Sequence, residues 1–383
     1  MRAQYDVIVL GAGPAGLATA ITIRRETRAS VLVADARAAA RERFGESVAP
    51  DLLVPLKQLG LLDQFRAGAH APCPGSASIW GGDRVGYNDY ILNPAGLAWR
   101  LQRRAFDEML TRAAAESGVE LCWATRYLQS MPDKKGRRLL LSSPKGKSEV
   151  RGRWIVDATG SAARFGLHAG ARRIVDDRMY GLARYATILA GNMTMQILME
   201  ADEDGWWYAA RLPDDRVVIL FATEVETARR LKSRGHEGFE RSLGATRLIA
   251  PILGKLELER RGYFATPIYS SGLDRPEGAG WLAVGDAASS YDPIVARGIT
   301  KALEDGVTAG RRIIEDLEDA LAGGGRNPER RQDTSSYSEQ IAARFRIYAE
   351  TRARLYEIEG RDSPFWQRRR DRSGAMVARA NET

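Results

Sequence analysis

Three glycines near the start of the chain have the spacing of a turn that binds phosphate. Gly11, Gly13 and Gly16 stand in the sequence GAGPAG, together with Ala15. The apolar run YDVIVL precedes them and LATAITIRR follows, so we expect a strand at residues 5–10, a tight turn and then a helix. In such a turn the first glycine permits the bend, the second lets the backbone approach a pyrophosphate, and the third lets the helix pack on the strand.

A carboxylate follows at the distance that the same turn requires. Asp35 ends the next apolar run, VLVAD, and lies about 20 residues beyond the glycines, where an acidic side chain accepts hydrogen bonds from a ribose. The helix that starts after the turn directs its amides toward the anion. Glycines with this spacing are weak evidence by themselves, but here the strand, the helix and the acid occur in register. We therefore predict that the first part of the chain binds a dinucleotide.

Two later segments favour FAD over NAD as that dinucleotide. In WIVDATG an apolar run ends at Asp157 and is followed by Gly160. In residues 280–306 a predicted strand ends at Gly285 and Asp286, and a loop then leads to a helix. A carboxylate at a strand end can accept a hydrogen bond from a ribityl hydroxyl. An ordinary acidic cap between a strand and a helix is the alternative interpretation.

The helix of this second segment starts shortly after the loop proline, Pro293. We expect the amides of its first residues, Gly298 and Ile299, to face the flavin, because a helix start stabilises negative charge on a reduced isoalloxazine ring. Apolar residues then recur every three or four positions through residues 303–321, which predicts a long helix.

The motifs in this order resemble those of the flavoprotein monooxygenases with the p-hydroxybenzoate hydroxylase fold. They are GAGPAG, an Arg-x-x-Phe-Asp helix that starts at Arg103, DATG, and GDAA with a downstream proline and Gly-Ile, and they span most of residues 1–325. The resemblance implies that Arg103 contacts the FAD phosphates and that Asp286 contacts the ribityl chain. It also implies that three residues lie beside the flavin ring: Pro293, Gly298 and Ile299.

Within this fold, residues 44–65 resemble the Gly-Glu segment of the flavin-dependent halogenases. The chain departs from the halogenase pattern at three places. The chain has no lysine between Lys57 and Lys134. Ala210 and Arg211 occupy the positions of Ile and Pro in the halogenase Trp-x-Trp-x-Ile-Pro signature. The loop after Pro293 reads Ala-Arg-Gly. We therefore expect no halogenation.

Another branch of the fold fits the sequence better. GWWYAARLP and the C-terminal YAETRARLYEIEGRDSPFWQRR resemble the flavoproteins of tryptophylquinone cofactor biogenesis, which mature quinohemoprotein amine dehydrogenases and lysine or glycine oxidases. This resemblance implies an FAD-dependent monooxygenase that uses O2 and a flavin C4a-hydroperoxide to hydroxylate a peptidyl tryptophan of a small partner protein. Trp206 and Tyr208 are the expected substrate-pocket residues, because alternation along a strand places them on one face.

The catalytic groups are less well defined by the motifs. Glu46, in the Gly-Glu segment, is the candidate acid or base, with a structural role near FAD as the alternative, and Pro293 is the second residue assigned to the catalytic centre. Because one dinucleotide fingerprint occurs, electrons come from NAD(P)H that binds transiently or from a separate flavin reductase. A small-molecule phenol or indole hydroxylase and a non-catalytic flavoprotein chaperone are the alternative functions.

These motifs predict an α/β chain with a Rossmann-like FAD-binding domain of the glutathione-reductase type. An antiparallel-sheet substrate domain interrupts it, and a C-terminal helical segment follows. The predicted division is 1–70, 95–180 and 265–325 for the FAD-binding domain, 71–94 and 181–264 for the substrate domain, and 326–383 for the C-terminal segment. Residues 322–331, AGGGRNPERR, are expected to form a hinge or loop.

The composition favours a cytoplasmic enzyme. The chain has 383 residues, of which 44% are apolar, and no apolar run approaches the roughly 20 residues that span a bilayer, so we expect no membrane partner. Its two cysteines and three histidines lack metal-ligand spacing, and no metal site is expected. The net charge of +8 is consistent with solvated charged faces on an arginine-rich protein, with an acidic partner or an anionic cofactor as the alternative interpretation. We expect no nucleic-acid partner, because no recognised binding module surrounds the basic run near the C-terminus.

Overall fold

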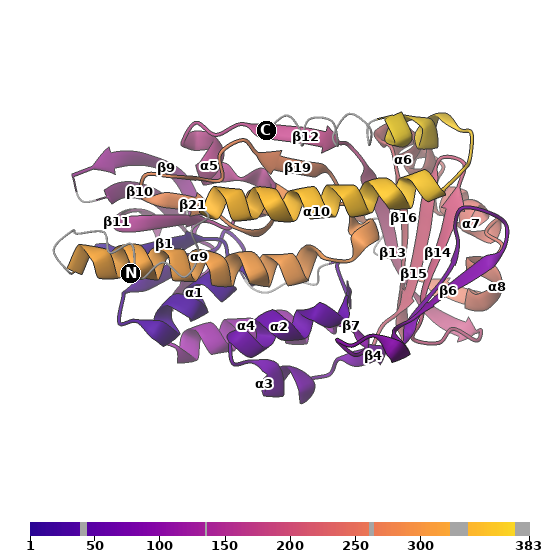
Figure 1. Ribbon diagram of the computed structural model, residues 1–383, viewed down its shortest axis with the longest axis horizontal. Helices are drawn as coiled ribbons and strands as arrows, with labels where there is room; N and C mark the ends of the chain where they lie inside the picture. The colour runs from indigo at the N-terminus through magenta and orange to yellow at the C-terminus, as the bar shows by residue number, and fades with distance from the viewer. Residues whose placement is uncertain (39–43, 135, 260–263, 322–335, 372–383) are drawn as a thin grey trace.

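The computed structural model describes residues 1–38, 44–134, 136–259, 264–321 and 336–371. Figure 1 shows a first sheet at one end of the molecule and a second sheet at the other, with long helices running between them. The predicted hinge at 322–331 lies outside the described residues. Within the described ranges, no helix is long and apolar enough to cross a membrane.

The first sheet is built around parallel strands whose apolar runs are buried on both faces. Its order is β20-β21-β11-β1-β2-β8, and β9 and β10 extend it as a hairpin from β11. The strands are β1 (Gln4–Leu10), β2 (Val31–Ala34), β8 (Glu120–Cys122), β9 (Arg126–Asp133), β10 (Gly136–Ser143), β11 (Gly146–Asp157), β20 (Glu277–Gly278) and β21 (Trp281–Ala283). Because β1, β2, β11 and β21 run parallel, their carboxyl ends meet at one edge, where ligands bind in open α/β sheets.

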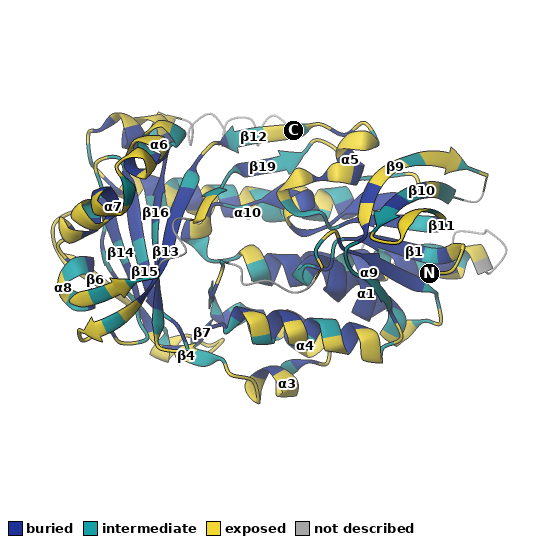
Figure 2. Cartoon of the chain, turned by 180° about the vertical axis from the view of Figure 1, so that it is seen from behind, coloured by how far each residue is buried: buried dark blue, intermediate teal, exposed yellow. Residues whose placement is uncertain are grey.

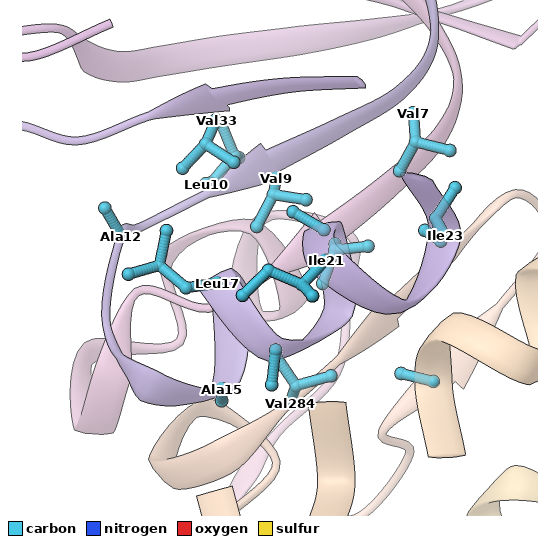
Figure 3. Close-up of a cluster of buried hydrophobic side chains, with 14 of the residues drawn as sticks. Val7, Val9, Leu10, Ala12, Ala15, Leu17, Ile21, Ile23, Val33 and Val284 are labelled. Atoms are coloured by element: carbon cyan, nitrogen blue, oxygen red, sulfur yellow. The ribbon is translucent and has the colours of Figure 1, made fainter. Parts of the chain in front are cut away.

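Two helices, α1 (Pro14–Glu26) and α9 (Gly298–Leu321), pack on each other beside this sheet. Figure 3 shows Leu17 and Ile21 of α1 directed at Val9 and Val33 of the strands. Glycines allow the close approach of α9. A Cβ atom at Gly306 would lie 2.5 Å from the carbonyl oxygen of Ala15 and 2.6 Å from the Cβ of Ala18. This packing holds the starts of both helices at the same edge of the sheet.

The second sheet is largely antiparallel and has the order β17-β13-β16-β15-β14-β5-β6, with β18 paired to β13. Helices α6 (Val225–Ser233), α7 (Gly235–Gly244) and α8 (Ile249–Leu253) cover its outer face (Figure 2). Trp207 packs there between Phe221 and Phe239. The strands are β5 (Gly75–Ile79), β6 (Val85–Asp89), β13 (Tyr180–Ala190), β14 (Ile197–Asp202), β15 (Gly205–Arg211), β16 (Arg216–Thr223), β17 (Lys255–Leu258) and β18 (Phe264–Pro267).

Smaller elements connect the two sheets. The 22-residue helix α10 (Tyr337–Ile358) starts at a capping box between Ser336 and Glu339 and packs against α9 (Figure 1). Residues 364–371 are also helical. The remaining helices are α2 (Leu53–Gln58), α3 (Leu62–Arg66), α4 (Arg103–Glu116) and α5 (Arg164–His168). The remaining strands are β3 (Ser47–Val48), β4 (Ala71–Cys73), β7 (Ala98–Arg100), β12 (Arg173–Asp177), β19 (Ser270–Leu273) and β22 (Ser289–Ser290).

The predicted fold class is confirmed. Two local features shape the second sheet and its helices. Strand β14 starts only at Ile197. The hydroxyl of Thr194 accepts a hydrogen bond from the Gln196 amide, which favours a turn at this point. The helical segment after β16 is divided into α6 and α7 at Arg234, because the next residue, Gly235, has a φ of +64°.

Candidate functional site

A cavity of about 660 Å³ lies between the carboxyl edge of the first sheet and the inner face of the second. It extends from the glycine turn after β1 to the aromatic residues of β15. Most of the residues predicted for the site line it. They are Gly11, Gly13, Ala15, Asp35, Glu46, Arg103, Gly160, Trp206, Tyr208, Gly285, Asp286, Pro293, Gly298 and Ile299. The volume is within the range of about 300–1,000 Å³ that is usual for ligand sites.

The glycine turn has the close contacts that its spacing predicts. Gly11 has a φ of +115°, and a Cβ atom there would lie 2.2 Å from the carbonyl oxygen of Ala158. Gly16 does not line the cavity, but a Cβ atom on it would lie 2.1 Å from the carbonyl oxygen of Gly11. Gly13 is the N-cap of α1, and Pro14 occupies the first helical turn, so the helix start faces the cavity.

Asp35 lines the cavity with both carboxylate oxygens already hydrogen-bonded. One oxygen accepts from the Ala12 amide at 2.7 Å, and Arg37 donates to both oxygens. Burial by itself would raise the pKa of Asp35, but the hydrogen bonds from Arg37 and from the Ala12 amide outweigh it and hold the pKa below its ordinary value. Arg37 also lines the cavity. Sequence reasoning missed Arg37, although a cation two residues after the acid was a usable signal.

Asp157 does not line the cavity, and its expected contact with the cofactor needs correction. It is fully buried, and its carboxylate accepts hydrogen bonds from the amide and hydroxyl of Thr159 and from the amide of Gly166. Burial raises its pKa, and these hydrogen bonds partly offset the effect. Asp157 therefore shapes the loop, whereas Thr159 and Gly160 form the surface that a ligand can reach.

Arg103 is positioned at the first turn of α4. The Gln102 side chain caps this helix by accepting a hydrogen bond from the Ala105 amide at 2.6 Å. The Arg103 guanidinium donates to the carbonyl of Phe44 and lies 3.2 Å from a carboxylate oxygen of Asp107. It is almost fully buried, and it lines the cavity.

Asp286 presents a carboxylate to the cavity at the turn after β21. Gly285 adopts a φ of +60° there, and its amide donates to the buried Asp305 carboxylate at 3.1 Å. Asp286 is exposed to solvent, but the surrounding protein still desolvates its carboxylate and raises its pKa. The positive charges of Lys301 and Arg173 partly oppose this rise in pKa. Within the described residues, no hydrogen bond to this carboxylate is formed, so it is available to a ligand.

The turn at Pro293 is held from the far C-terminal part of the chain. Asp292 accepts from the Ile294 amide at 3.0 Å through one oxygen and from the Tyr356 hydroxyl at 2.7 Å through the other. The Tyr356 hydroxyl in turn accepts from the indole nitrogen of Trp206 at 3.1 Å. Trp206 therefore lies between the cavity and α10, and its indole N–H is already paired.

The start of α9 is open toward the cavity. Gly298 and Ile299 both line it, and a Cβ atom added to Gly298 would meet nothing within 4 Å. Amides of a helix start are partly positive, so a ring that carries negative charge is stabilised here. Tyr291 lines the cavity nearby and stacks on Tyr348 with ring centroids 3.9 Å apart.

Tyr208 lies at the end of the cavity away from the glycine turn, on the same face of β15 as Trp206. Its hydroxyl is hydrogen-bonded to the Ser47 hydroxyl and accepts from the Arg100 guanidinium at 3.2 Å. Burial raises its pKa, although the Arg100 charge opposes that rise. Other lining residues here are mainly apolar: Val218, Leu220 and Ile268. This end suits a flat aromatic ring.

A protein-family model described as FAD binding domain matches residues 4–324, which is most of the chain. The chain belongs to this FAD-binding family. LodB of Marinomonas mediterranea, named as an FAD-dependent oxidoreductase, is 26% identical over 96% of this chain and 97% of its own length. The family model therefore shows a flavin-dependent enzyme, and the curated proteins that the chain resembles include FAD-dependent oxidoreductases and flavin-dependent halogenases.

Two solved structures share the fold at lower identity. CmlS, a flavin-dependent halogenase, superposes with a TM-score of 0.81 at 21% identity, over 100% of this chain and 71% of CmlS. QhpG, a peptidyl tryptophan dihydroxylase essential for tryptophylquinone cofactor biogenesis, superposes with a TM-score of 0.72 at 24% identity, over 96% of this chain and 79% of QhpG. At these identities the likeness shows the fold.

The residues of this FAD-binding chain fit the cofactor at three separate points. A Cβ atom at Gly11 would collide with the Ala158 carbonyl oxygen, so glycine is needed for the tight turn that lines the cavity. Farther along, Asp286 offers a carboxylate that accepts no hydrogen bond from the described residues, and the start of α9 offers free space at Gly298. In the described part of the chain, no cluster of three or more His, Cys, Asp or Glu side chains could hold a metal ion.

Glu46 is the buried carboxyl group in the wall of this cavity. One oxygen accepts from the Tyr185 hydroxyl at 2.8 Å, and the other accepts from the Gly45 amide at 3.0 Å. The Glu46 residue is only 4% exposed. Burial raises the pKa of Glu46, and the Tyr185 hydrogen bond and the Arg103 charge partly oppose that rise. A carboxyl group with a raised pKa is suited to accept and release protons near neutral pH.

Proposed function

We propose that the protein is an FAD-dependent monooxygenase that hydroxylates the indole ring of a tryptophan in a partner protein. The observation that carries the proposal is the single cavity, which joins the cofactor-contact edge to the aromatic end at Trp206 and Tyr208, with the carboxyl of Glu46 in its wall. The full-length match to LodB and the shared fold of QhpG support this branch of the family.

In this proposal bound FAD, once reduced, activates O2 for transfer of one oxygen atom to the ring. The protein residues have three tasks. The cofactor would be held by Gly11, Asp286 and Gly298. The space for the substrate ring is lined by Trp206 and Tyr208. The second sheet forms one wall of the cavity and limits the access of water from that side. Glu46 is the group in the wall that can accept the ring proton.

The electron donor is either NAD(P)H that binds transiently or a separate flavin reductase. Anaerobic mixing of the FAD-loaded protein with NADH or NADPH distinguishes them. Rapid bleaching of the flavin absorbance supports direct reduction. If bleaching needs an added reductase, the donor is a second protein.

The substrate test uses the purified FAD-loaded protein, a reductant, O2 and the candidate partner, which the gene neighbourhood should supply. We expect the mass of a tryptophan-containing peptide from the partner to rise by one or two oxygen atoms. Efficient turnover of free phenols or indoles, with no change in the partner, would instead support a small-molecule hydroxylase. Halogenated product in the presence of chloride or bromide would favour the halogenase activity that CmlS has.

A non-catalytic flavoprotein chaperone is the remaining alternative. Stopped-flow mixing of the reduced protein with O2, with and without the partner, separates it from an oxygenase. The oxygenase should show a transient flavin absorbance before full reoxidation. Direct reoxidation with no transient under either condition would support the chaperone.

A further inference from the structure

Glu46 lies in a wall shared by two separate spaces. On one side is the main cavity. On the other side is a small pocket of about 20 Å³, which is formed by the start of α4 and by the turn between β15 and β16. Its lining consists of Glu46, Leu101, Gln102, Arg103, Arg104, Leu212, Pro213, Asp214 and Arg216.

The small pocket has the size and polarity to hold a water molecule. A space of roughly 10–15 Å³ is enough for one water when polar partners surround it. At its outer side stand Asp214, whose side chain is 37% exposed, and Arg216, which lies 2.8 Å from an Asp214 carboxylate oxygen. A proton that reaches this pocket can therefore pass to bulk water.

We propose that Glu46 accepts the proton that the substrate ring loses and passes it through a water in the small pocket to Asp214 and bulk solvent. This rests on the proposed aromatic hydroxylation. After the ring carbon has gained oxygen, its C–H bond breaks, the electron pair returns to the ring, and the proton moves to a Glu46 oxygen. The proton then leaves through the water. No electron is transferred in these steps, and the O2 and two-electron reductant of the hydroxylation are the only co-reactants.

The surroundings of Glu46 favour this route over one through its other neighbours. Tyr185 is stacked on Phe44 with centroids 5.3 Å apart, and Phe264 meets both rings edge-on, so aromatic rings enclose Tyr185 on that side. The charged group next to the Tyr185 ring is the Arg216 guanidinium, 5.0 Å from its centroid, and Arg216 itself lines the small pocket. The small pocket is the polar side. The charged and titratable groups of the described residues that contact Glu46 or share the small pocket with it come from four elements and one turn. They are Arg103 and Arg104 from α4, Tyr185 from β13, Tyr208 from β15, Asp214 from the turn before β16, and Arg216 at the start of β16.

The first test replaces the carboxyl group itself. Glu46→Gln keeps the size and an acceptor for Tyr185 but cannot carry the proton, so we expect kcat to fall by about 10²–10⁴-fold, as for loss of a general base. The dissociation constant of FAD should stay within twofold. With a ring-deuterated substrate, a primary isotope effect should appear in Glu46→Gln because proton loss has become slow. In Glu46→Ala, added formate should restore part of the rate, which a merely structural role for Glu46 would not allow.

The second test closes the exit while it leaves Glu46 in place. Leu212→Phe adds a ring next to the small pocket and should lower kcat without changing KM. Asp214→Asn should lower kcat less, because water at the mouth can still accept the proton. Asp215→Asn is the matched control, since Asp215 is in the same turn but does not line the pocket, and its φ of +65° is one that asparagine tolerates.

The outcomes separate the relay from the proposed function. If the wild-type protein hydroxylates no aromatic ring, both proposals fail. If it does, and Glu46→Gln keeps the wild-type kcat without an isotope effect, the relay alone is wrong. If Glu46→Gln behaves as expected but Leu212→Phe, with the pocket shown to be filled, matches the wild type, the exit through the small pocket is wrong.

Discussion

Replacing Asp286 by alanine should weaken FAD binding without weakening the fold. The Asp286 carboxylate faces the cavity and accepts no hydrogen bond within the described residues, so its removal leaves no buried protein donor unpaired. The lost interaction is a charged hydrogen bond to the cofactor, worth about 1.5–3 kcal/mol. This corresponds to a rise of about 10- to 150-fold in the dissociation constant of FAD.

The stability of the apoprotein distinguishes a loss of FAD binding from a loss of folding. Desolvation raises the pKa of Asp286, which means that its ionised form destabilises the folded state above its ordinary titration range. The Asp286→Ala apoprotein should therefore unfold at no lower temperature than the wild-type apoprotein near neutral pH.

The assay titrates apoprotein with FAD and follows the change in flavin fluorescence. Asp286→Asn keeps an acceptor oxygen and should lose less affinity than the alanine variant. Asp63→Ala, on the exposed surface of α3, is the control for a carboxylate far from the cavity. An Asp286→Ala protein that folds and binds FAD with the wild-type dissociation constant would refute the assigned contact.

Three further predictions concern the glycine turn, the C-terminal contact and pH. Gly11→Ala should abolish FAD retention and lower the melting temperature, because the added Cβ atom would lie 2.2 Å from the carbonyl oxygen of Ala158. Gly82→Ala is the control and should match the wild type, because a Cβ atom added to Gly82 would meet no atom within 4 Å. Tyr356→Phe should lower the free energy of unfolding by about 1–3 kcal/mol in denaturant titrations, since it removes the hydroxyl that Asp292 accepts from and leaves an indole N–H unpaired; an unchanged midpoint would contradict this. Burial raises the pKa of Glu46, so the stability it contributes is complete below the ordinary glutamate pKa of about 4.3 and is lost as pH rises through the folded-state pKa. The melting temperature of the wild type minus that of Glu46→Gln should fall between pH 4 and pH 8, and a constant difference would show that the pKa is not raised.

The parts of the site that the sequence predicted are those that depend on short stretches of backbone. The turn at Gly11, the helix starts at Gly13 and Gly298, and the Gly285–Asp286 turn all line the cavity as expected. Each needs a strand, a few residues of defined conformation and a helix, and these are determined by neighbours in the chain. The same locality explains why alternation along β15 separated Trp206 from Trp207 correctly.

Side-chain partners from distant segments could not be read in this way. Asp157 also follows a strand, yet its carboxylate turns into its own loop and away from the cavity. The carboxylate of Asp35 accepts hydrogen bonds from Arg37. The indole N–H of Trp206 donates to the hydroxyl of Tyr356, which lies 150 residues later in the chain. Which oxygen meets which donor depends on how whole elements pack, and small changes in packing exchange one partner for another.

The sequence by itself determined the cofactor class and the fold of this protein, because its glycine and carboxylate spacings occur in register with predicted strands and helices and together specify a backbone shape that fits a dinucleotide. It also singled out Glu46, but only as a residue in a recognisable segment. The tertiary structure alone placed Glu46 between the main cavity and the small pocket, since their walls come from segments far apart in the chain. The glycine turn after β1 and strand β15 line the main cavity, whereas the start of α4, residues 212–214 and Arg216 line the small pocket. A carboxyl group gains a proton path only when such segments close around it, and that closure is a property of the packed molecule.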